Sequence, residues 1–229
     1  MTLRQNIFTY ISRAAISVVL LLAWLPADAQ KLFRLEQDTI PLMRGFQVSF
    51  DLVGAAQLMF SDYGQYEAAL RLNLHDQWFP VFEIGYGKAY HEEDLVTGMA
   101  YKTQAPYFRA GVDFNLLKKK HQENRLFAGF RYAYTSYKAD IWRQDFLDPV
   151  WLWPTRYDVR NMQCNQHWLE AVFGLDAQVF GPFHLGWSLR YRQRLSHNEG
   201  DLGNTWYVPG FGIQDSSNIG ATFNVIIDI

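Results

Sequence analysis

The chain has 229 residues, of which 49% are hydrophobic and 17% aromatic, and its formal net charge is −2. A chain of this length fits one domain. So mild a charge argues against nucleic acid or a highly charged substrate as its partner. The one cysteine, Cys164, excludes an intramolecular disulfide, and we expect it to be an unpaired thiol in a loop.

The first 29 residues are predicted to be a helical, cleaved secretory signal peptide. Arg4 and Arg13 give a basic start, an apolar run follows at 14–25, and small residues lead to the expected cleavage between Ala29 and Gln30. This order of basic, apolar and small residues is typical of exported proteins. The apolar run is shorter than the roughly 20 residues that a membrane-spanning helix needs.

Beyond the signal peptide, apolar and polar residues alternate with a period of two, which is typical of strands with unlike faces. The fourth segment illustrates this, since Phe108, Ala110 and Val112 alternate with Arg109 and Asp113. Eight such segments are predicted, near 45–60, 65–74, 79–90, 105–116, 125–137, 167–179, 184–194 and 218–229. The chain thus divides into a signal peptide at 1–29, a short periplasmic segment at 30–44 and a barrel domain at 45–229.

The connections between these segments alternate in length. Short ones fall near 75–78, 117–124 and 180–183, whereas the opposite ones fall near 61–64, 91–104, 138–166 and 195–217, and three of these are long. Short periplasmic turns with longer outer loops are typical of outer-membrane barrels, and strands of about 10 residues are long enough to cross a bilayer. We therefore predict an all-β fold, an eight-stranded antiparallel up-and-down transmembrane β-barrel in the cell outer membrane.

Aromatic residues gather at the segment ends that face the long loops. Rings with one polar edge favour the boundary between membrane and water, so we expect an outer aromatic girdle. Its predicted members are Tyr66, Tyr86, Tyr90, Tyr107, Phe108, Tyr132, Tyr134, Tyr137 and Tyr191. The last segment is expected to pair with the first, because an unpaired strand edge in hydrocarbon leaves backbone groups unsatisfied.

The polar faces of the segments carry acids and arginines in nearly equal numbers. The planar guanidinium group of arginine suits bidentate pairing with carboxylates, and an eight-stranded barrel is only wide enough for its inward side chains to fill. We therefore predict a plugged interior with an ion-pair network rather than an open pore. Its predicted members are Asp51, Glu67, Arg71, Glu83, Arg109, Asp113, Arg131, Glu170, Asp176, Arg190 and Arg192.

The sequence resembles small outer-membrane barrels of the OmpA/OmpX-like architecture over roughly 45–229. Its signal sequence, the stretch Tyr207–Gly212 and the segment Asn218–Ile229 are similar to those of small Bacteroidota barrels, including families of unknown function. The resemblance implies outer-membrane lipids and lipopolysaccharide as surroundings, and the barrel-assembly machinery as a partner during biogenesis. One departure is Ile229, because the last residue of such barrels is often aromatic. The resemblance implies no catalytic residue.

The sequence contains no motif for a metal site, a cofactor or catalysis. Ser196 and His197 are adjacent, an arrangement that rarely forms a nucleophile–base pair, so we expect no enzyme, no cofactor and no nucleic-acid partner. Aromatic residues in the predicted outer loop at 138–166 are expected either to hold an unidentified extracellular ligand or to cover the barrel mouth. The candidate binding residues are Trp142, Trp151, Trp153 and Tyr157.

Three functions stay open on the sequence alone. The first is a structural, adhesion or surface-ligand-binding barrel with long extracellular loops and a plugged, charged interior. The second is a narrow channel or transporter, which requires a continuous wet lumen. The third is a soluble secreted lipocalin-like barrel, whose apolar faces would enclose a ligand instead of facing lipid.

Overall fold

The computed structural model describes residues 41–92, 94, 97–118, 121–147, 150–151, 153–198, 200 and 205–229, without the side chains of 144–147 and 155–156. The predicted signal peptide, its cleavage between Ala29 and Gln30 and most of the predicted periplasmic segment at 30–44 lie outside the described residues. Among the residues described, no helix is both long enough and apolar enough to cross a membrane.

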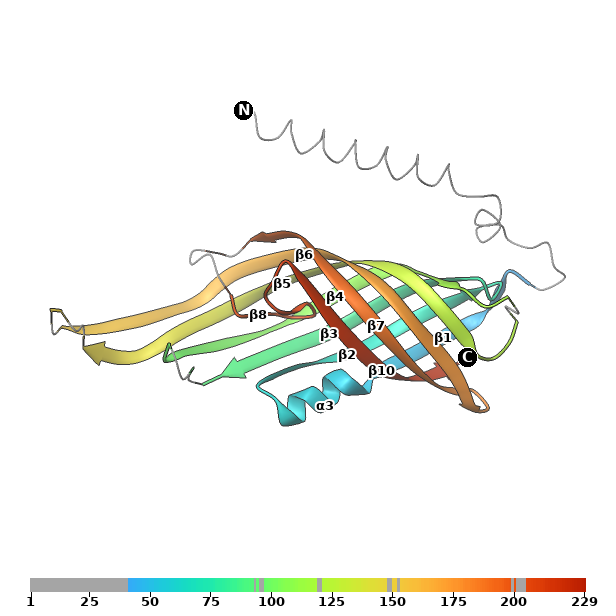
Figure 1. The fold of residues 1–229 in the computed structure, drawn as a ribbon, viewed down its shortest axis with the longest axis horizontal. Helices are drawn as coiled ribbons and strands as arrows, with labels where there is room; N and C mark the ends of the chain where they lie inside the picture. Colours follow the sequence, from blue (N-terminus) through green and yellow to red (C-terminus); the bar gives the residue numbers. More distant parts are fainter. Residues whose placement is uncertain are drawn as a thin grey trace, which may run out of the picture. The chain divides into compact units, whose positions relative to one another are not determined.

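Eight antiparallel strands form a closed barrel (Figure 1). They are β1 (Met43–Asp51), β2 (Tyr63–Leu74), β3 (Trp78–His91), β4 (Met99–Asn115), β5 (Arg125–Leu147), β6 (Pro154–Phe180), β7 (Phe183–Asn198) and β10 (Ser217–Asp228). The ring closes where β1 pairs with β10, from Gln47 opposite Asp228 to Asp51 opposite Asn224. The predicted eight-stranded antiparallel barrel is confirmed.

At one end of the barrel, the short-turn end, two of the three connections between strands are tight turns, and the opposite end is the long-loop end. The turn between β2 and β3 covers 75–77, and the turn between β6 and β7 covers only Gly181 and Pro182. His75 and Asp76 have φ angles of 58° and 53°, the left-handed region that a tight reversal often uses. The predicted alternation of short and long connections holds only in part, because the connection between β4 and β5 at this end spans 116–124 and is longer than those at 92–98 and 148–153 at the other end.

The first connection at the long-loop end is a helix, α3 (Leu52–Phe60), where alternation predicted a strand that continued to residue 60. The Asp51 side chain accepts hydrogen bonds from the backbone N–H groups of Val53 at 3.0 Å and Gly54 at 3.1 Å, which is an N-cap arrangement. The Gly-Ala-Ala run at 54–56 also interrupts the alternation. The strand prediction was therefore wrong beyond Asp51.

β5 and β6 continue as a paired hairpin well beyond the other strands, and their ribbons reach furthest to the left in Figure 1. The prediction of a loop at 138–166 was wrong over most of its length, since pairing extends to Leu147 opposite Pro154. Alternation persists through this region, because Tyr137 is buried while Lys138 is exposed. The charged residues mark the outward face of a strand there, not a loop.

The outward faces form an apolar belt around the barrel. Along β5, Phe130 is 66% exposed and Tyr132 48%, whereas Arg131 between them is 2% exposed. The belt covers nine to eleven residues in each of four strands, at 78–86 in β3, 126–134 in β5, 169–179 in β6 and 183–191 in β7. Because tilted strands of about 9–11 residues cross the hydrocarbon core of a bilayer, the belt has the height of a membrane.

Beyond the belt, toward the long connections, the barrel reverses its polarity. Lys88, Lys102 and Lys138 point outward there, and apolar side chains fill the interior. This outer core consists of Ala89, Tyr101, Ala105, Tyr107, Ala133, Tyr137, Ala139, Met162, Cys164, Trp168, Tyr207, Val208 and Phe211. The outer end is thus packed like a water-soluble barrel, and Cys164, which we expected in a loop, lies buried in β6 within this core.

Rings mark the outer edge of the belt, although two predicted members of the girdle point the other way. Tyr86, Tyr132 and Tyr191 are 43–48% exposed. Tyr107 and Tyr137 are only 0% and 3% exposed, because both occupy alternate positions that face into the barrel. Their assignment to the girdle was wrong, since nearness to a strand end does not decide on which face a ring lies.

Candidate functional site

Buried arginines and carboxylates fill the barrel at the depth of the apolar belt. Arg109 lies at the centre of this network, with Nη1 3.0 Å from Glu83 Oε2 and Nε 2.9 Å from Glu170 Oε1. Arg109 also pairs with Glu67. The four residues are 1–6% exposed. Charges buried to this extent are stable only when they are paired and hydrogen-bonded.

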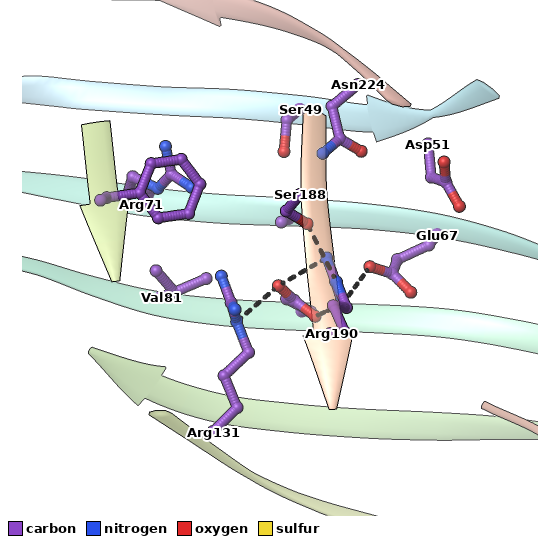
Figure 2. A pocket seen from close by; sticks show the side chains of 12 residues that line it. Ser49, Asp51, Glu67, Arg71, Val81, Arg131, Ser188, Arg190 and Asn224 are labelled. Atoms are coloured by element: carbon purple, nitrogen blue, oxygen red, sulfur yellow. Dashed lines mark hydrogen bonds and ion pairs between the residues drawn. The ribbon is translucent and has the colours of Figure 1, made fainter. Parts of the chain in front are cut away.

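Two further arginines share these carboxylates. Arg190 of β7 lies 2.8 Å from Glu83 Oε2 and 3.0 Å from Glu67 Oε1, and Arg131 of β5 lies 2.8 Å from Glu83 Oε1. Figure 2 shows Arg131 and Arg190 pointing into the same space, with Glu67 nearby. Glu83 therefore contacts three guanidinium groups, including that of Arg109, and links β3 to β4, β5 and β7.

The network extends along the barrel in both directions. Toward the short turns, Arg71 lies 2.5 Å from Asp176 and 3.1 Å from Asp113. Toward the long connections, Arg192 Nε lies 3.4 Å from Glu170 Oε1. The structure thus brings ten of the eleven predicted residues together in contiguous ion pairs.

Asp51, the eleventh residue, departs from the predicted ion pairing. Besides capping α3, its carboxylate accepts a hydrogen bond from the backbone N–H of Phe223 in β10 at 3.3 Å. The hydrogen bonds that Asp51 makes among the described residues are to backbone N–H groups. Asp51 therefore links the end of β1 to α3 and to β10, a role that depends on a helix that the alternation did not predict.

Little space remains between the charged side chains. The cavity among Glu67, Glu83 and Arg190 measures ≈10 Å³, which is about the smallest volume that holds one water molecule. An aromatic ring covers part of this layer, since the guanidinium carbon of Arg71 lies 4.5 Å from the ring centre of Phe127. The described side chains therefore fill the barrel at this depth.

A small hairpin covers the charged network on the side of the long connections. Its strands are β8 (Tyr207–Val208) and β9 (Gly212–Ile213). Arg109 Nη2 donates a hydrogen bond to the Gly210 carbonyl at 2.7 Å, and Arg192 Nη1 donates one to the Phe211 carbonyl at 2.8 Å. We call residues 207–213 the plug hairpin, because they are held inside the barrel by the network beneath them.

Glycines allow the plug hairpin to approach the barrel wall closely. Gly210 has a φ of 82°, a left-handed conformation that favours glycine, and a Cβ there would lie 2.5 Å from the Tyr107 ring. A Cβ at Gly87 would lie 2.8 Å from Pro209 Cα. The Tyr107 hydroxyl also donates to Glu67 at 2.7 Å. The ring of Tyr107 therefore connects the plug hairpin to the ion-pair network.

A pocket of ≈590 Å³, the outer pocket, opens at the outer end of the barrel. Trp206 is central to it, with its ring centre 5.3 Å from that of His91 and 5.9 Å from that of Tyr101. Polar side chains complete the lining, among them Asp94, Thr97, Thr205 and Gln214. Sequence reasoning missed Trp206, and the available signal was an aromatic pair ahead of a Pro-Gly turn within a predicted loop. Pockets of this size that combine rings with a few polar groups suit small ligands.

The four predicted binding residues are distributed over three places. Tyr157 lines the outer pocket. Trp142 lies on the other face of the β5–β6 hairpin, where the guanidinium carbon of Arg160 is 4.2 Å from its ring centre. Trp151 and Trp153 are each 74% exposed near the hairpin tip. The structure therefore does not gather these residues into one site.

At the opposite end, outside the belt, Asp76 organises the turn between β2 and β3. Asn73 Nδ2 donates to Asp76 Oδ1 at 2.7 Å, Oδ2 lies 2.7 Å from His121 Nδ1, and Arg44 pairs with the same carboxylate. Burial raises the pKa of Asp76, but these hydrogen bonds outweigh burial and hold the pKa below its ordinary value. Within the described residues, no group of three or more His, Cys, Asp or Glu side chains is placed to hold a metal ion.

The fold and the network define a class of protein, a closed eight-stranded barrel with a filled, charged interior inside an apolar belt. The sequence model of one family, described as a domain of unknown function (DUF6048), matches residues 10–228. The chain therefore belongs to that family. No curated protein matches the sequence.

The solved structures that match the barrel include two bacterial surface proteins. Neisserial surface protein A (NspA) aligns with a TM-score of 0.43 and 11% sequence identity, over 82% of this chain and 99% of that chain. Ail, the attachment invasion locus protein of Yersinia pestis, aligns with a TM-score of 0.36 and 10% identity, over 80% of this chain and 93% of that chain. The Ail structure was solved in complex with the heparin analogue sucrose octasulfate.

Proposed function

We propose that the chain is an integral outer-membrane protein that presents a ligand-binding surface at its outer end and does not conduct solutes. The observation that carries the proposal is the polarity of the barrel wall, which is apolar outside and charged inside over the height of a bilayer. Contact with outer-membrane lipids and lipopolysaccharide, and assembly by the barrel-assembly machinery, belong to this proposal.

Two observations argue against the two other functions. A lipocalin-like barrel encloses its ligand with apolar side chains, but at the depth of the belt Glu83 and Arg109 are buried while Phe82 and Phe108 are more than half exposed. A channel needs a wet lumen, but the network leaves only ≈10 Å³ between its side chains and the plug hairpin lies above it. In planar bilayers we therefore expect no steady conductance.

The ligand that we propose for the outer pocket is a small glycan. Trp206 and Tyr157 offer ring faces for the apolar side of a sugar ring, and Asp94, Thr97 and Gln214 offer hydrogen-bonding groups. The pocket lies at the end of the barrel that the proposal places outside the cell. A glycan is consistent with a lining that is mostly apolar and aromatic and carries a few polar groups.

Binding of a panel of oligosaccharides to the refolded protein tests this proposal. Trp206→Ala removes the central ring, and we expect binding to weaken at least tenfold, because a ring face that contacts the ligand is lost. Trp153→Ala is the matched control, since it removes an exposed ring away from the pocket. Equal binding by wild type and Trp206→Ala, or loss only with Trp153→Ala, would exclude the outer pocket as the site.

A further inference from the structure

The barrel wall is incomplete near the outer edge of the belt. β1 ends at Asp51, while both of its neighbours continue, β2 from Tyr63 and β10 from Ser217. The last pairs that β1 makes are Phe50 opposite Ala68 and Asp51 opposite Asn224. Residues 63–67 of β2 and 217–223 of β10 therefore flank a gap, and β10 residue Ile219 pairs with Tyr191 at the outer edge of the belt.

α3 covers this gap, but it fits its two neighbours unequally (Figure 1). Against β2 the fit is close, since a Cβ at Gly64 would lie 2.6 Å from Leu58 N and a Cβ at Gly54 would lie 2.7 Å from Gln65 O. Against β10 a cleft of ≈300 Å³ remains. The seam between α3 and β10 is therefore the open side of the wall.

The cleft passes from the lipid-facing surface to the barrel interior. Val53, Ile219 and Ala221 line its outer part, and Arg192 and Gln65 line its inner part. Val53 is 40% exposed and Ile219 is 74% exposed, whereas Arg192 is 7% exposed. A molecule in the cleft would contact apolar and polar groups at the same time.

Arg192 is the cation at the inner end of the cleft. Its Nη1 donates to the Phe211 carbonyl, while its Nε has no hydrogen bond of good geometry and faces Glu170 at 3.4 Å. Its Nη2 lies against Gly220 of the β10 edge, where a Cβ would approach to 2.9 Å. The nearby acid, Asp51, already accepts three backbone N–H groups. The Glu170 carboxylate also contacts Arg109 and Arg190, so it neutralises the guanidinium of Arg192 only in part.

We propose that the cleft between α3 and β10 is a lateral binding site for an anionic membrane lipid, whose phosphate contacts Arg192 and whose chain lies along Val53, Ile219 and Ala221. The proposal rests on the membrane location proposed above. Charge complementarity identifies the phosphate, and the position of the cleft at the outer edge of the belt places it where headgroups meet acyl chains.

The test measures lipid retention by native mass spectrometry. The protein is refolded into vesicles of phosphatidylglycerol or of zwitterionic phosphatidylcholine and is then extracted in mild detergent. Ala221→Trp fills the cleft from the lipid side, and Arg192→Gln removes the cation. Ala171→Trp, at a lipid-facing alanine of β6, and Arg194→Gln, on β7 outside the cleft lining, are the matched controls.

We expect wild type and both controls to retain one phosphatidylglycerol, and Ala221→Trp and Arg192→Gln to retain at least tenfold less. Equal retention by wild type and Ala221→Trp would overturn the site. If inorganic phosphate displaces the lipid equally from wild type and from Ala221→Trp, the site binds free anions. That result would also overturn the proposed lipid site. A wild-type protein that fails to float with either vesicle would overturn the membrane location, a result that differs from insertion without retention.

Discussion

The buried charged side chains at the depth of the belt stabilise the barrel by neutralising one another. Arg109 contacts three carboxylates from three strands, Glu67, Glu83 and Glu170, and it also holds the plug hairpin through the Gly210 carbonyl. Because the site excludes water, removing one partner leaves buried charges that nothing neutralises. The loss is expected to be large, although the net gain from forming the pairs is small.

Arg109→Met is expected to lower the free energy of unfolding by about 3–5 kcal/mol, the range for breaking a buried pair. Urea titration of the refolded protein in micelles measures this. Arg160→Met is the control, because the Arg160–Asp158 pair is exposed, with 44% of the Arg160 side chain accessible, and exposed pairs contribute about 0–1 kcal/mol. Equal losses from the two substitutions would mean that the interior is hydrated.

Asp76 makes the stability of the short-turn end depend on pH. Its pKa is below the ordinary value in the folded protein, so its contribution is present above the ordinary pKa of about 3.9 and is lost as the pH falls through the folded value. Wild type should therefore lose more stability than Asp76→Asn below about pH 4. Melting of both proteins between pH 7 and pH 3 measures the difference, with Asp215→Asn as an exposed control. Parallel pH profiles for wild type and Asp76→Asn would contradict it.

At the scale of elements, the plug hairpin is held by geometry that only glycine permits. Gly210→Ala adds a Cβ 2.5 Å from the Tyr107 ring and strains a φ of 82°. Gly181→Ala is a matched control, because Gly181 has a φ of 52° and no atom within 4 Å of its Cβ position.

Both substitutions carry the backbone strain of about 1–2 kcal/mol, and we expect Gly210→Ala to lose about 1–3 kcal/mol more through overpacking. Urea unfolding of the two variants compares them, and faster amide exchange at 207–213 should accompany the larger loss. If both lose the same amount, the hairpin does not pack against Tyr107.

The alternation of residue types predicted all eight strands within the belt, because each strand there has unlike faces. It failed beyond the belt, where it gave the wrong bounds for β1, β5 and β6. α3 depends on Asp51 as a cap, and the extension of β5 and β6 has lysine where the belt has rings. The position of the plug hairpin inside the barrel depends on hydrogen bonds from Arg109 and Arg192. These are tertiary interactions between distant segments, and no local pattern reports them.

The candidate site shows the same division. Glu67, Glu83 and Arg109 occupy alternating strand positions that face the barrel interior. Their proximity to one another was therefore predictable once a closed barrel was assumed. Which carboxylate each arginine contacts depends on strand stagger, which the sequence does not reveal. The outer pocket was missed because Trp206 lies in a connection between strands, where the alternation of a strand does not predict which way a side chain points.

At the scale of the whole barrel, the polarity of its interior and exterior changes along the barrel axis. A charged, filled layer lies inside the apolar belt, and an apolar core lies inside a polar wall beyond the belt. The exterior of each layer matches its surroundings, since lipid requires an apolar exterior and water permits a polar one. The outer half then holds the plug hairpin and the outer pocket in a fixed position above the membrane.

The most direct test of this account is the accessibility of spin labels placed along β5 in the protein refolded into phospholipid vesicles. Cys164→Ser provides the background, and single cysteines replace Ala128, Phe130 and Lys138. The account predicts that labels at 128 and 130 contact oxygen dissolved in hydrocarbon, while the label at 138 contacts a water-soluble nickel complex. Nickel access at 128 and 130 would contradict it, because the belt would then face water and not lipid.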